Sequence, residues 1–219
     1  MTQNDTQAQE PLATRLKRET AQAHEQAENS TFMTELMGGN LDKQAFIDLQ
    51  EQSLLFYSAL EGALDSFAQD PCVQYVADRR LDRVQHLRHD IEQLGGNTQP
   101  EPLPATAEYV ATLEHIAKDG NAAEMIAHHY VRYLGDLSGG QVVASKMKNL
   151  LGVPEEALTF YRFDGIGKLK PYKDTYRAAL DKLQALMSSE EQDQMAIAAG
   201  EAFTCNHNVF VNLGKIHHN

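Results

Sequence analysis

Apolar residues recur at intervals of three and four positions along most of this chain, which is the spacing of one face of an α-helix. One such stripe consists of Phe46, Leu49, Phe56, Leu60, Ala63 and Phe67, and a second consists of Val73, Val76, Val84, Leu87, Ile91 and Leu94. No stretch alternates apolar and polar residues with the period of two that is typical of a half-buried strand. The sequence therefore predicts an all-α fold, a helical bundle.

The positions of the other helices are predicted from turn residues and from the same apolar spacing. A first helix is predicted from near Pro11, and further helices follow the Pro-rich link 100–104 and run from about 122 to 150, 172 to 187 and 190 to 213. The segment 158–170 has no clean period, so we expect it to be irregular. We expect the polar residues 1–10 to form a disordered tail and residues 11–219 to form a single domain, because no linker divides them.

Composition narrows the class of protein. The net charge of −12 argues against a nucleic-acid binder, whose affinity would come from Lys and Arg neutralising phosphates. The two cysteines, Cys72 and Cys205, lack CxxC spacing, and no secretory leader is present, which favours a reducing compartment, the cytoplasm by default. No apolar run approaches the roughly 18 residues of a membrane span, so we expect a soluble protein without an anchor.

The first predicted helix carries a candidate metal ligand. Lys17, His24 and Glu28 are seven and four positions apart, which puts them near one face, beside apolar residues. A neutral histidine there can bind heme iron, and a carboxylate one turn away can accept its other N–H. Lys17 lies about 10 Å further along the axis, far enough to meet a propionate at the porphyrin edge. A solvated helix face with a packed histidine remains the alternative.

A glycine-rich run inside the long helix is the stronger signal. It reads Tyr133-Leu134-Gly135-Asp136-Leu137-Ser138-Gly139-Gly140-Gln141, and each glycine costs roughly 1 kcal/mol relative to Ala in a helix interior. Gly135 and Gly139 are one turn apart, so both remove side chains from one patch, where a flat ligand can approach the backbone and the helix can kink over it. Close packing of two helices through small residues is the alternative.

Polar residues accompany the glycines. Arg132 and Asp136 are four positions apart, and a carboxylate beside a glycine-lined patch can hold a water that supplies a proton to a bound oxygen species. A surface ion pair is the alternative. Lys173 and Arg177 are basic in an acidic protein and suit either the carboxylates of a ligand or an acidic redox partner, with a solvated basic face as the alternative. Asn206 lies on an apolar stripe and needs a hydrogen-bond partner if it is buried.

Several of these stretches together resemble the heme oxygenase family, most closely its soluble bacterial branch. The motifs that carry the resemblance are residues 20–28 with Phe32-Met33, 130–141 and 172–177, and it extends through 55–61 and 202–206. It covers nearly the whole chain from Pro11 onward. The resemblance implies a single-domain helical bundle in which heme lies between the first helix and a Gly-kinked distal helix.

The resemblance also assigns roles to individual residues. It implies that His24 is the proximal iron ligand and that Glu28 supports its other nitrogen. Gly135 and Gly139 would belong to the distal helix, and Asp136 would organise a water network. The residues implied to share that polar network are Tyr57, Arg132 and Asn206, and those implied to contact the heme or its propionates are Lys17, Tyr130, Lys173, Arg177 and Phe203.

The implied reaction is the oxidative cleavage of heme b to biliverdin, of the IX-alpha isomer, with release of ferrous iron and carbon monoxide. Heme is both cofactor and substrate, and molecular oxygen and external electrons are required. Without a membrane anchor, a soluble ferredoxin or a flavoprotein reductase is the expected electron donor. Such an enzyme can serve iron acquisition, heme detoxification or pigment supply.

Other classes of protein can share this helical architecture, namely thiamin-degrading proteins of similar fold, di-iron carboxylate bundles and non-catalytic heme binders. Di-iron carboxylate bundles need Glu-x-x-His pairs, and the chain contains none. A non-catalytic heme carrier or sensor commonly uses a second strong axial ligand, and His128 or His129 would have to supply it. Both precede Gly135 by more than a turn, which disfavours ligation directly above the iron.

Overall fold

The computed structural model describes residues 10–217, and within that range the regular elements are all helical. The α-helices are α1 (Leu12–Glu19), α2 (Ala21–Glu28), α3 (Thr31–Gly38), α4 (Lys43–Ser66), α5 (Val84–Leu94), α6 (Pro104–Asp119), α7 (Ala122–Leu151), α8 (Leu169–Leu183) and α9 (Ser189–His217). The short 3-10 turns are η1 (Val73–Tyr75), η2 (Arg79–Leu81), η3 (Glu155–Ala157), η4 (Thr159–Tyr161) and η5 (Asp164–Ile166). The all-α prediction is confirmed. The predicted tail, residues 1–10, lies outside the described residues except for Glu10.

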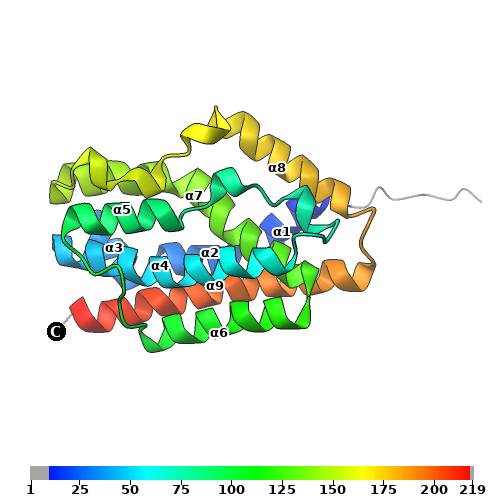
Figure 1. Cartoon of the computed structure of the whole chain (residues 1–219), viewed down its shortest axis with the longest axis horizontal. Coiled ribbons are helices and arrows are strands. Elements are labelled where there is room, and N and C mark those ends of the chain that lie inside the picture. The colour runs from blue at the N-terminus through cyan, green and yellow to red at the C-terminus, as the bar shows by residue number, and fades with distance from the viewer. Residues whose placement is uncertain (1–9, 218–219) are drawn as a thin grey trace, which may run out of the picture.

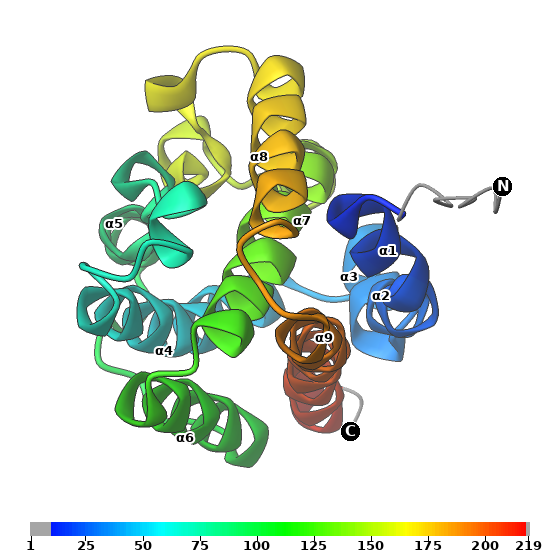
Figure 2. The ribbon, with the colours of Figure 1, turned by 90° about the vertical axis from the view of Figure 1, so that its right-hand side faces the viewer.

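The long helix α7 runs through the middle of the bundle. Figure 1 shows α4, α6 and α9 lying along the long axis of the molecule, with α7 crossing them and curving along its length. Figure 2, turned to look along that axis, places α1, α2 and α3 to one side of α7 and α8 above it. Helix α7 contacts α4, α6 and α9, which together bury most of its first half. It can therefore present side chains to several elements at once.

Local sequence signals account for where the long helices start and stop. The side chain of Asn121 caps α7 by accepting a hydrogen bond from the backbone N–H of Glu124 at 3.2 Å. The helix ends at Gly152, whose φ of 64° is a left-handed conformation that glycine adopts without a steric penalty. Helix α6 likewise begins on Pro104 and ends at Gly120.

The predicted helices agree with α4, α6, α7 and α9, whereas α8 (Leu169–Leu183) begins three and ends four residues before the predicted 172–187, and two other predicted helices are wrong. The stripe from Val73 to Leu94 is not one helix, because only Val84–Leu94 is α-helical and the earlier part forms the turns η1 and η2. Asp78 interrupts it, since its side chain accepts a hydrogen bond from the backbone N–H of Arg80 and so starts a tight turn. The segment predicted to be irregular, 158–170, contains the short turns η4 and η5 and the first two residues of α8.

The predicted first helix is likewise two helices, which meet at Thr20. The hydroxyl of Thr20 donates to the carbonyl of Leu16 at 2.7 Å, a contact that favours a bend. Helix α3 was not predicted. It starts at Ser30, whose side chain accepts a hydrogen bond from the N–H of Met33.

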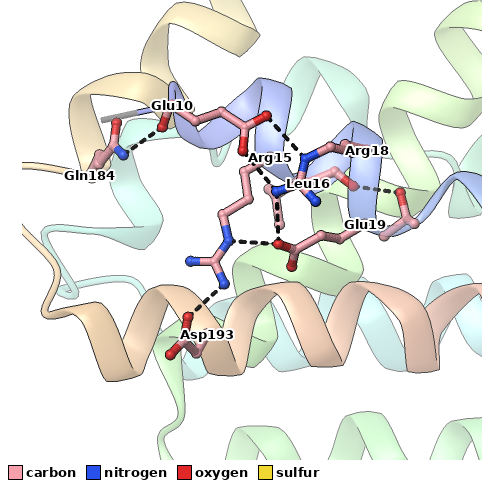
Figure 3. A network of polar contacts seen from close by, with 8 residues as sticks. Glu10, Arg15, Leu16, Arg18, Glu19, Gln184 and Asp193 are labelled. Carbon is pink, nitrogen blue, oxygen red and sulfur yellow. Dashed lines mark hydrogen bonds and ion pairs between the residues drawn. The ribbon is translucent and has the colours of Figure 1, made fainter. Parts of the chain in front are cut away.

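Polar contacts attach α1 to α8 and α9 (Figure 3). The guanidinium of Arg15 lies 2.6 Å from the carboxylate of Asp193 on α9, and the backbone N–H of Ala13 donates to Asp181 on α8 at 2.9 Å. The amide of Gln184 donates to the carbonyl of Glu10 at 2.8 Å. These contacts fix where α1, and with it α2, lies relative to the bundle. No helix in the described range is long and apolar enough to cross a membrane.

Candidate functional site

A cavity of about 440 Å³ lies between the first two helices and α7. Cofactor and small-molecule sites commonly have volumes of about 300–1,000 Å³. Its lining from the N-terminal helices is Ala13, Lys17, Thr20, Ala21, His24, Ala27, Glu28 and Met33. Its lining from α7 is Tyr130, Val131, Arg132, Leu134, Gly135, Asp136, Ser138, Gly139, Gly140 and Val143. The other lining residues are Leu49, Gln50, Ser53, Phe160, Tyr161, Arg177, Phe203, Asn206 and Phe210.

Helix α2 presents an imidazole to this cavity. The His24 side chain is 47% exposed, and its Nε2 atom lies 3.4 Å from a carboxylate oxygen of Glu28. The ring meets that of Phe203 edge to face, with centroids 5.3 Å apart. The histidine is therefore oriented by two neighbours while its ring stays accessible from the cavity, which is what an open ligand position requires.

At Gly135 and Gly139, helix α7 presents bare backbone to the cavity. A Cβ atom added at Gly135 or at Gly139 would meet no described heavy atom within 4 Å outside the helix itself, and both residues line the cavity. Gly140 differs, because a Cβ there would lie 3.1 Å from the ring of Tyr161. The alternative that Gly135 and Gly139 serve close helix packing is therefore wrong, because no helix within residues 10–217 fills the space that they leave.

Four of the predicted polar residues form one network drawn from three helices. The hydroxyl of Tyr57 on α4 donates to the carboxylate of Asp136 on α7. Arg132 donates to the Tyr57 oxygen from Nε at 3.2 Å and from Nη2 at 3.0 Å. Its Nη1 donates to the side-chain oxygen of Asn206 on α9 at 2.6 Å. Tyr57 does not itself line the cavity, but Asp136, Arg132 and Asn206 do.

Burial sets the protonation of this network. Removal from water raises the pKa of Asp136, although the charge of Arg132 and the hydrogen bond from Tyr57 act in the opposite direction. Burial also raises the pKa of Tyr57 well above its usual value. The hydroxyl of Tyr57 therefore stays protonated and acts as a hydrogen-bond donor to Asp136. The Arg132–Asp136 pair is 3.7 Å apart and only 12% and 11% exposed, so it is not the surface ion pair that the sequence left open.

Basic and phenolic groups also line the cavity. Lys17, Tyr130 and Arg177 all line the cavity, as predicted for a site that holds carboxylates. Burial raises the pKa of Tyr130, and the charge of Arg177 opposes that shift. Lys173 does not line the cavity; its ammonium lies 3.4 Å from the hydroxyl of Ser138, which does.

Neither of the two adjacent histidines of α7 reaches the cavity. Both are 1% exposed; Nδ1 of His128 lies 3.4 Å from the hydroxyl of Tyr109, and Nδ1 of His129 lies 2.7 Å from that of Tyr176. Burial lowers the pKa of His128 to about 4 and that of His129 to about 3. A second axial histidine, which a heme carrier would use, is therefore not offered by this pair.

The sequence did not single out four polar or aromatic residues of the lining, namely Gln50, Ser53, Phe160 and Tyr161. Gln50 and Ser53 lie on α4 among apolar neighbours, and the side chain of Gln50 donates to the hydroxyl of Tyr161 at 3.3 Å. Phe160 and Tyr161 belong to η4, in the segment that had no period. The available signal was the adjacent aromatic pair Phe160-Tyr161 in a segment without helical periodicity.

Comparisons with known proteins agree with this geometry. A family model described as heme oxygenase matches residues 10–212. The heme oxygenase of Pyropia yezoensis is 33% identical over 208 residues, which are 93% of this chain and 86% of that protein. Heme oxygenase 1 of Gallus gallus is 33% identical over 211 residues, 94% of this chain and 70% of that protein.

Solved structures give the same result. Heme oxygenase-2 from Synechocystis sp. PCC 6803, in complex with heme and NO, is similar with a TM-score of 0.88 and 30% identity, covering 94% of this chain and 86% of that one. Heme oxygenase from Leptospira interrogans is similar with a TM-score of 0.86 and 30% identity, covering 92% and 98%.

Proposed function

Because this chain belongs to the heme oxygenase family, we propose that the cavity between α2 and α7 is its heme site. The enzyme cleaves heme, which is both substrate and cofactor. When bound, heme supplies the iron at which oxygen is activated and the ring that is opened to biliverdin, with release of iron and carbon monoxide. One observation carries the proposal: His24 and the bare backbone of Gly135 and Gly139 line the same cavity from two different helices.

The cavity fits a porphyrin by the chemistry of its lining. Apolar side chains such as Val131, Leu134 and Phe210 suit the flat faces of the ring, and the space beside the two glycines admits it. Among the described residues no three His, Cys, Asp or Glu side chains cluster as they would around a free metal ion. An iron already held by a porphyrin needs only one such ligand from the protein.

His24 is the proposed iron ligand. Its imidazole is accessible from the cavity and is oriented by Glu28 at 3.4 Å and by the ring of Phe203. We assign Glu28 the support of the nitrogen that does not face the iron. That contact fixes the ring orientation and the tautomer, as carboxylate partners of ligating histidines generally do.

The network around Asp136 is the proposed proton-delivery system. Tyr57 and Arg132 hold the carboxylate in place, and Asn206 holds Arg132. A buried carboxylate with a raised pKa, beside the glycine-lined patch, can bind a water and pass a proton without touching the iron. Gly135 and Gly139 contribute by leaving room for oxygen and for that water.

The basic groups at the cavity orient the substrate. We assign Lys17, Tyr130 and Arg177 to the propionates, because all three line the cavity and two carry the opposite charge. Lys173 is assigned to the same set at longer range, through its contact with Ser138. Fixing the propionates fixes which edge of the ring faces Asp136, which favours formation of the IX-alpha isomer.

Oxygen and external electrons complete the proposed reaction. We propose a ferredoxin or a flavoprotein reductase as donor, a cytoplasmic location, and a single catalytic domain spanning residues 11–219. The charge of Lys173, which lies outside the cavity lining, suits an acidic redox partner in a protein whose net charge is −12.

Turnover of added heme tests this function. Purified protein is mixed with hemin in air, with ascorbate or a ferredoxin system as reductant and with catalase present to remove free peroxide. Loss of the Soret band, growth of a biliverdin band and release of carbon monoxide are expected. A stable ferrous or oxygen-bound heme spectrum, with a donor known to reduce the complex, would instead indicate a carrier or sensor.

A further inference from the structure

The turn η4, between α7 and α8, forms part of the cavity wall without the support of a long helix. Its residues Phe160 and Tyr161 line the cavity and are 5% and 6% exposed. A short 3-10 turn makes few hydrogen bonds of its own. Its position must therefore be set by contacts with other elements.

A buried carboxylate of α5 holds the backbone N–H groups of this turn. One oxygen of Asp90 accepts from the N–H of Thr159 at 3.0 Å and from its hydroxyl at 2.7 Å. The other oxygen accepts from the N–H of Phe160 at 2.7 Å. Asp90 is fully buried, so these bonds are what compensate its charge for the loss of water.

A buried guanidinium at the start of α5 holds the carbonyls of the same turn. Arg83, which is 2% exposed, donates through Nη1 to the carbonyls of Phe160 at 3.2 Å and Arg162 at 2.6 Å. Its other side-chain bonds go to carbonyls of the preceding turn, and its Cζ atom lies 4.1 Å from the ring centroid of Phe163. Helix α5 thus clamps one short segment from both sides, with an anion on its N–H groups and a cation on its carbonyls.

The clamped segment touches the proton-delivery network. The ring of Phe160 meets that of Tyr57 edge to face, with centroids 5.4 Å apart and an interplanar angle of 77°. Tyr57 in turn donates to Asp136. The Tyr161 ring limits the cavity beside Gly140. Movement of η4 would therefore change both the support of Tyr57 and the shape of the cavity wall.

We propose that Arg83 and Asp90 are positioning residues for ring opening: by clamping η4 they hold Phe160 against Tyr57 and Tyr161 in the cavity wall. The proposal rests on the proposed function of the Tyr57–Asp136 network. Neither residue lines the cavity. We expect the clamp to determine which edge of the porphyrin ring is attacked. If the cavity wall moves, it no longer holds oxygen and substrate in a single orientation.

The first test measures the clamp in the heme-free protein. Asp90→Asn keeps the size of the side chain but turns one acceptor into a donor that faces an N–H group. The amide protons of Thr159 and Phe160 should then exchange with solvent about tenfold faster or more, whereas those in the core of α4 and α9 should not change. Glu92→Gln is the matched control, because Glu92 is an exposed carboxylate on the same helix. Unchanged exchange at Phe160, or faster exchange throughout the protein, would overturn the clamp.

The second test measures the products of ring opening. Asp90→Asn and Arg83→Lys, which keeps the charge but loses the forked donors, should each give a mixture of biliverdin isomers. Wild type, Glu92→Gln and Arg88→Lys should each give one isomer. Faster exchange at η4 with an unchanged isomer pattern would leave Arg83 and Asp90 a purely structural role and overturn the proposal. Arg83→Lys answers the question if Asp90→Asn does not fold. Failure of the proposed function is distinct, because it shows in the wild type as an absence of any biliverdin.

Discussion

Asp136 combines burial with a charge, and its neighbours show how that is achieved. One carboxylate oxygen accepts the Tyr57 hydroxyl, and the other lies 3.7 Å from Arg132. An unpaired buried carboxylate would cost several kcal/mol, so each partner is needed to keep Asp136 at the cavity. The same partners limit how it can rotate, which is useful for directing one water.

Replacing Asp136 by Ala should separate binding from chemistry. We expect Asp136→Ala to bind hemin nearly as tightly as wild type, because His24 and the basic groups at the cavity are untouched. The biliverdin yield should fall by roughly 10²-fold, the scale of a lost proton-transfer group. Hemin titration and product absorbance measure the two effects, with Asp164→Ala as an exposed control. An unchanged yield would remove Asp136 from the mechanism.

Glu61 makes a second prediction at this scale, concerning stability. Its carboxylate accepts from the backbone N–H groups of Arg83 and Val84, and burial raises its pKa to about 7. Between about pH 4.5 and 7 the folded protein keeps a proton that the unfolded chain has released, so stability falls as pH rises through that window. Glu61→Gln keeps an acceptor for both N–H groups and cannot ionise.

Glu61→Gln should therefore be more stable than wild type above pH 7, by about 1–3 kcal/mol, and similar to it below pH 4.5. Urea unfolding at a series of pH values measures this, with the exposed Glu108→Gln as control. Parallel pH curves for Glu61→Gln and wild type would show that the ionised carboxylate is not strained in the fold.

The sequence allowed the residues of the site to be predicted where a residue type is itself unusual. Gly135 and Gly139 are out of place in a helix, and His24 lies on an apolar face, so the residue types alone mark these positions as candidates. Phe160 was not predicted, because its place depends on bonds from Arg83 and Asp90, which are 77 and 70 positions away. Nothing in the local pattern of the segment carries that information.

At the scale of the element, α7 contains glycines, which destabilise a helix but leave one of its faces open. Its glycines lie within a helix of 30 residues. Since a Cβ at Gly135 or Gly139 would meet nothing nearby, neither glycine is needed to fold the heme-free protein. Their use must lie in what the cavity receives.

Gly135→Ala should accordingly stabilise the heme-free protein by about 0.5–1 kcal/mol and weaken hemin binding, because its methyl group would occupy the cavity. Gly62→Ala is the matched control: Gly62 lies within α4, and a Cβ there also meets nothing within 4 Å, but it is remote from the cavity lining. Urea unfolding and hemin titration measure both properties. Equal hemin affinity in the two variants would show that the bare patch at Gly135 does not receive heme.

Helices with an uninterrupted apolar stripe were the ones predicted well. Helices α4 and α6 follow such stripes, and residues that favour helix ends lie at their termini: Asp42 caps α4, Pro104 is the first residue of α6 and Gly120 follows its last turn. Two predicted helices were wrong at positions where a side chain forms a hydrogen bond with the backbone, namely Thr20 and Asp78. Both residues compete with helical hydrogen bonds through their own oxygen atoms, and a periodicity argument does not account for that competition.

At the scale of the whole molecule, the cavity lies between α7 and the N-terminal helices, which also share the hydrophobic core through Leu12, Leu16 and Phe32. Helix α1 is attached to α8 and α9 partly by ion pairs such as Arg15–Asp193, in which the aspartate is 60% exposed (Figure 3). Exposed pairs of this kind typically contribute little. A ligand that contacts both α2 and α7 would add a link across the interior.

Hemin should therefore raise the stability of the whole chain. At a free concentration 100 times its Kd, a ligand that binds only the folded state adds about 2.7 kcal/mol. Thermal unfolding with and without hemin measures the shift, and amide exchange in α2 should slow more than exchange in α6, which does not line the cavity. An unchanged midpoint would show that hemin does not bind the folded state preferentially, and protection confined to α6 would place the ligand elsewhere.

The identity of the iron ligand is the most direct test of how this molecule holds its substrate. After reduction of the hemin complex, resonance Raman spectra of the ferrous heme should show an iron–histidine band in wild type. The control His115→Ala, whose histidine is exposed on α6, should show the same band. The band should be absent in His24→Ala and should be restored when free imidazole is added, with turnover following it. An unchanged band and normal turnover in His24→Ala without imidazole would contradict the assignment of α2 as the proximal side of the site.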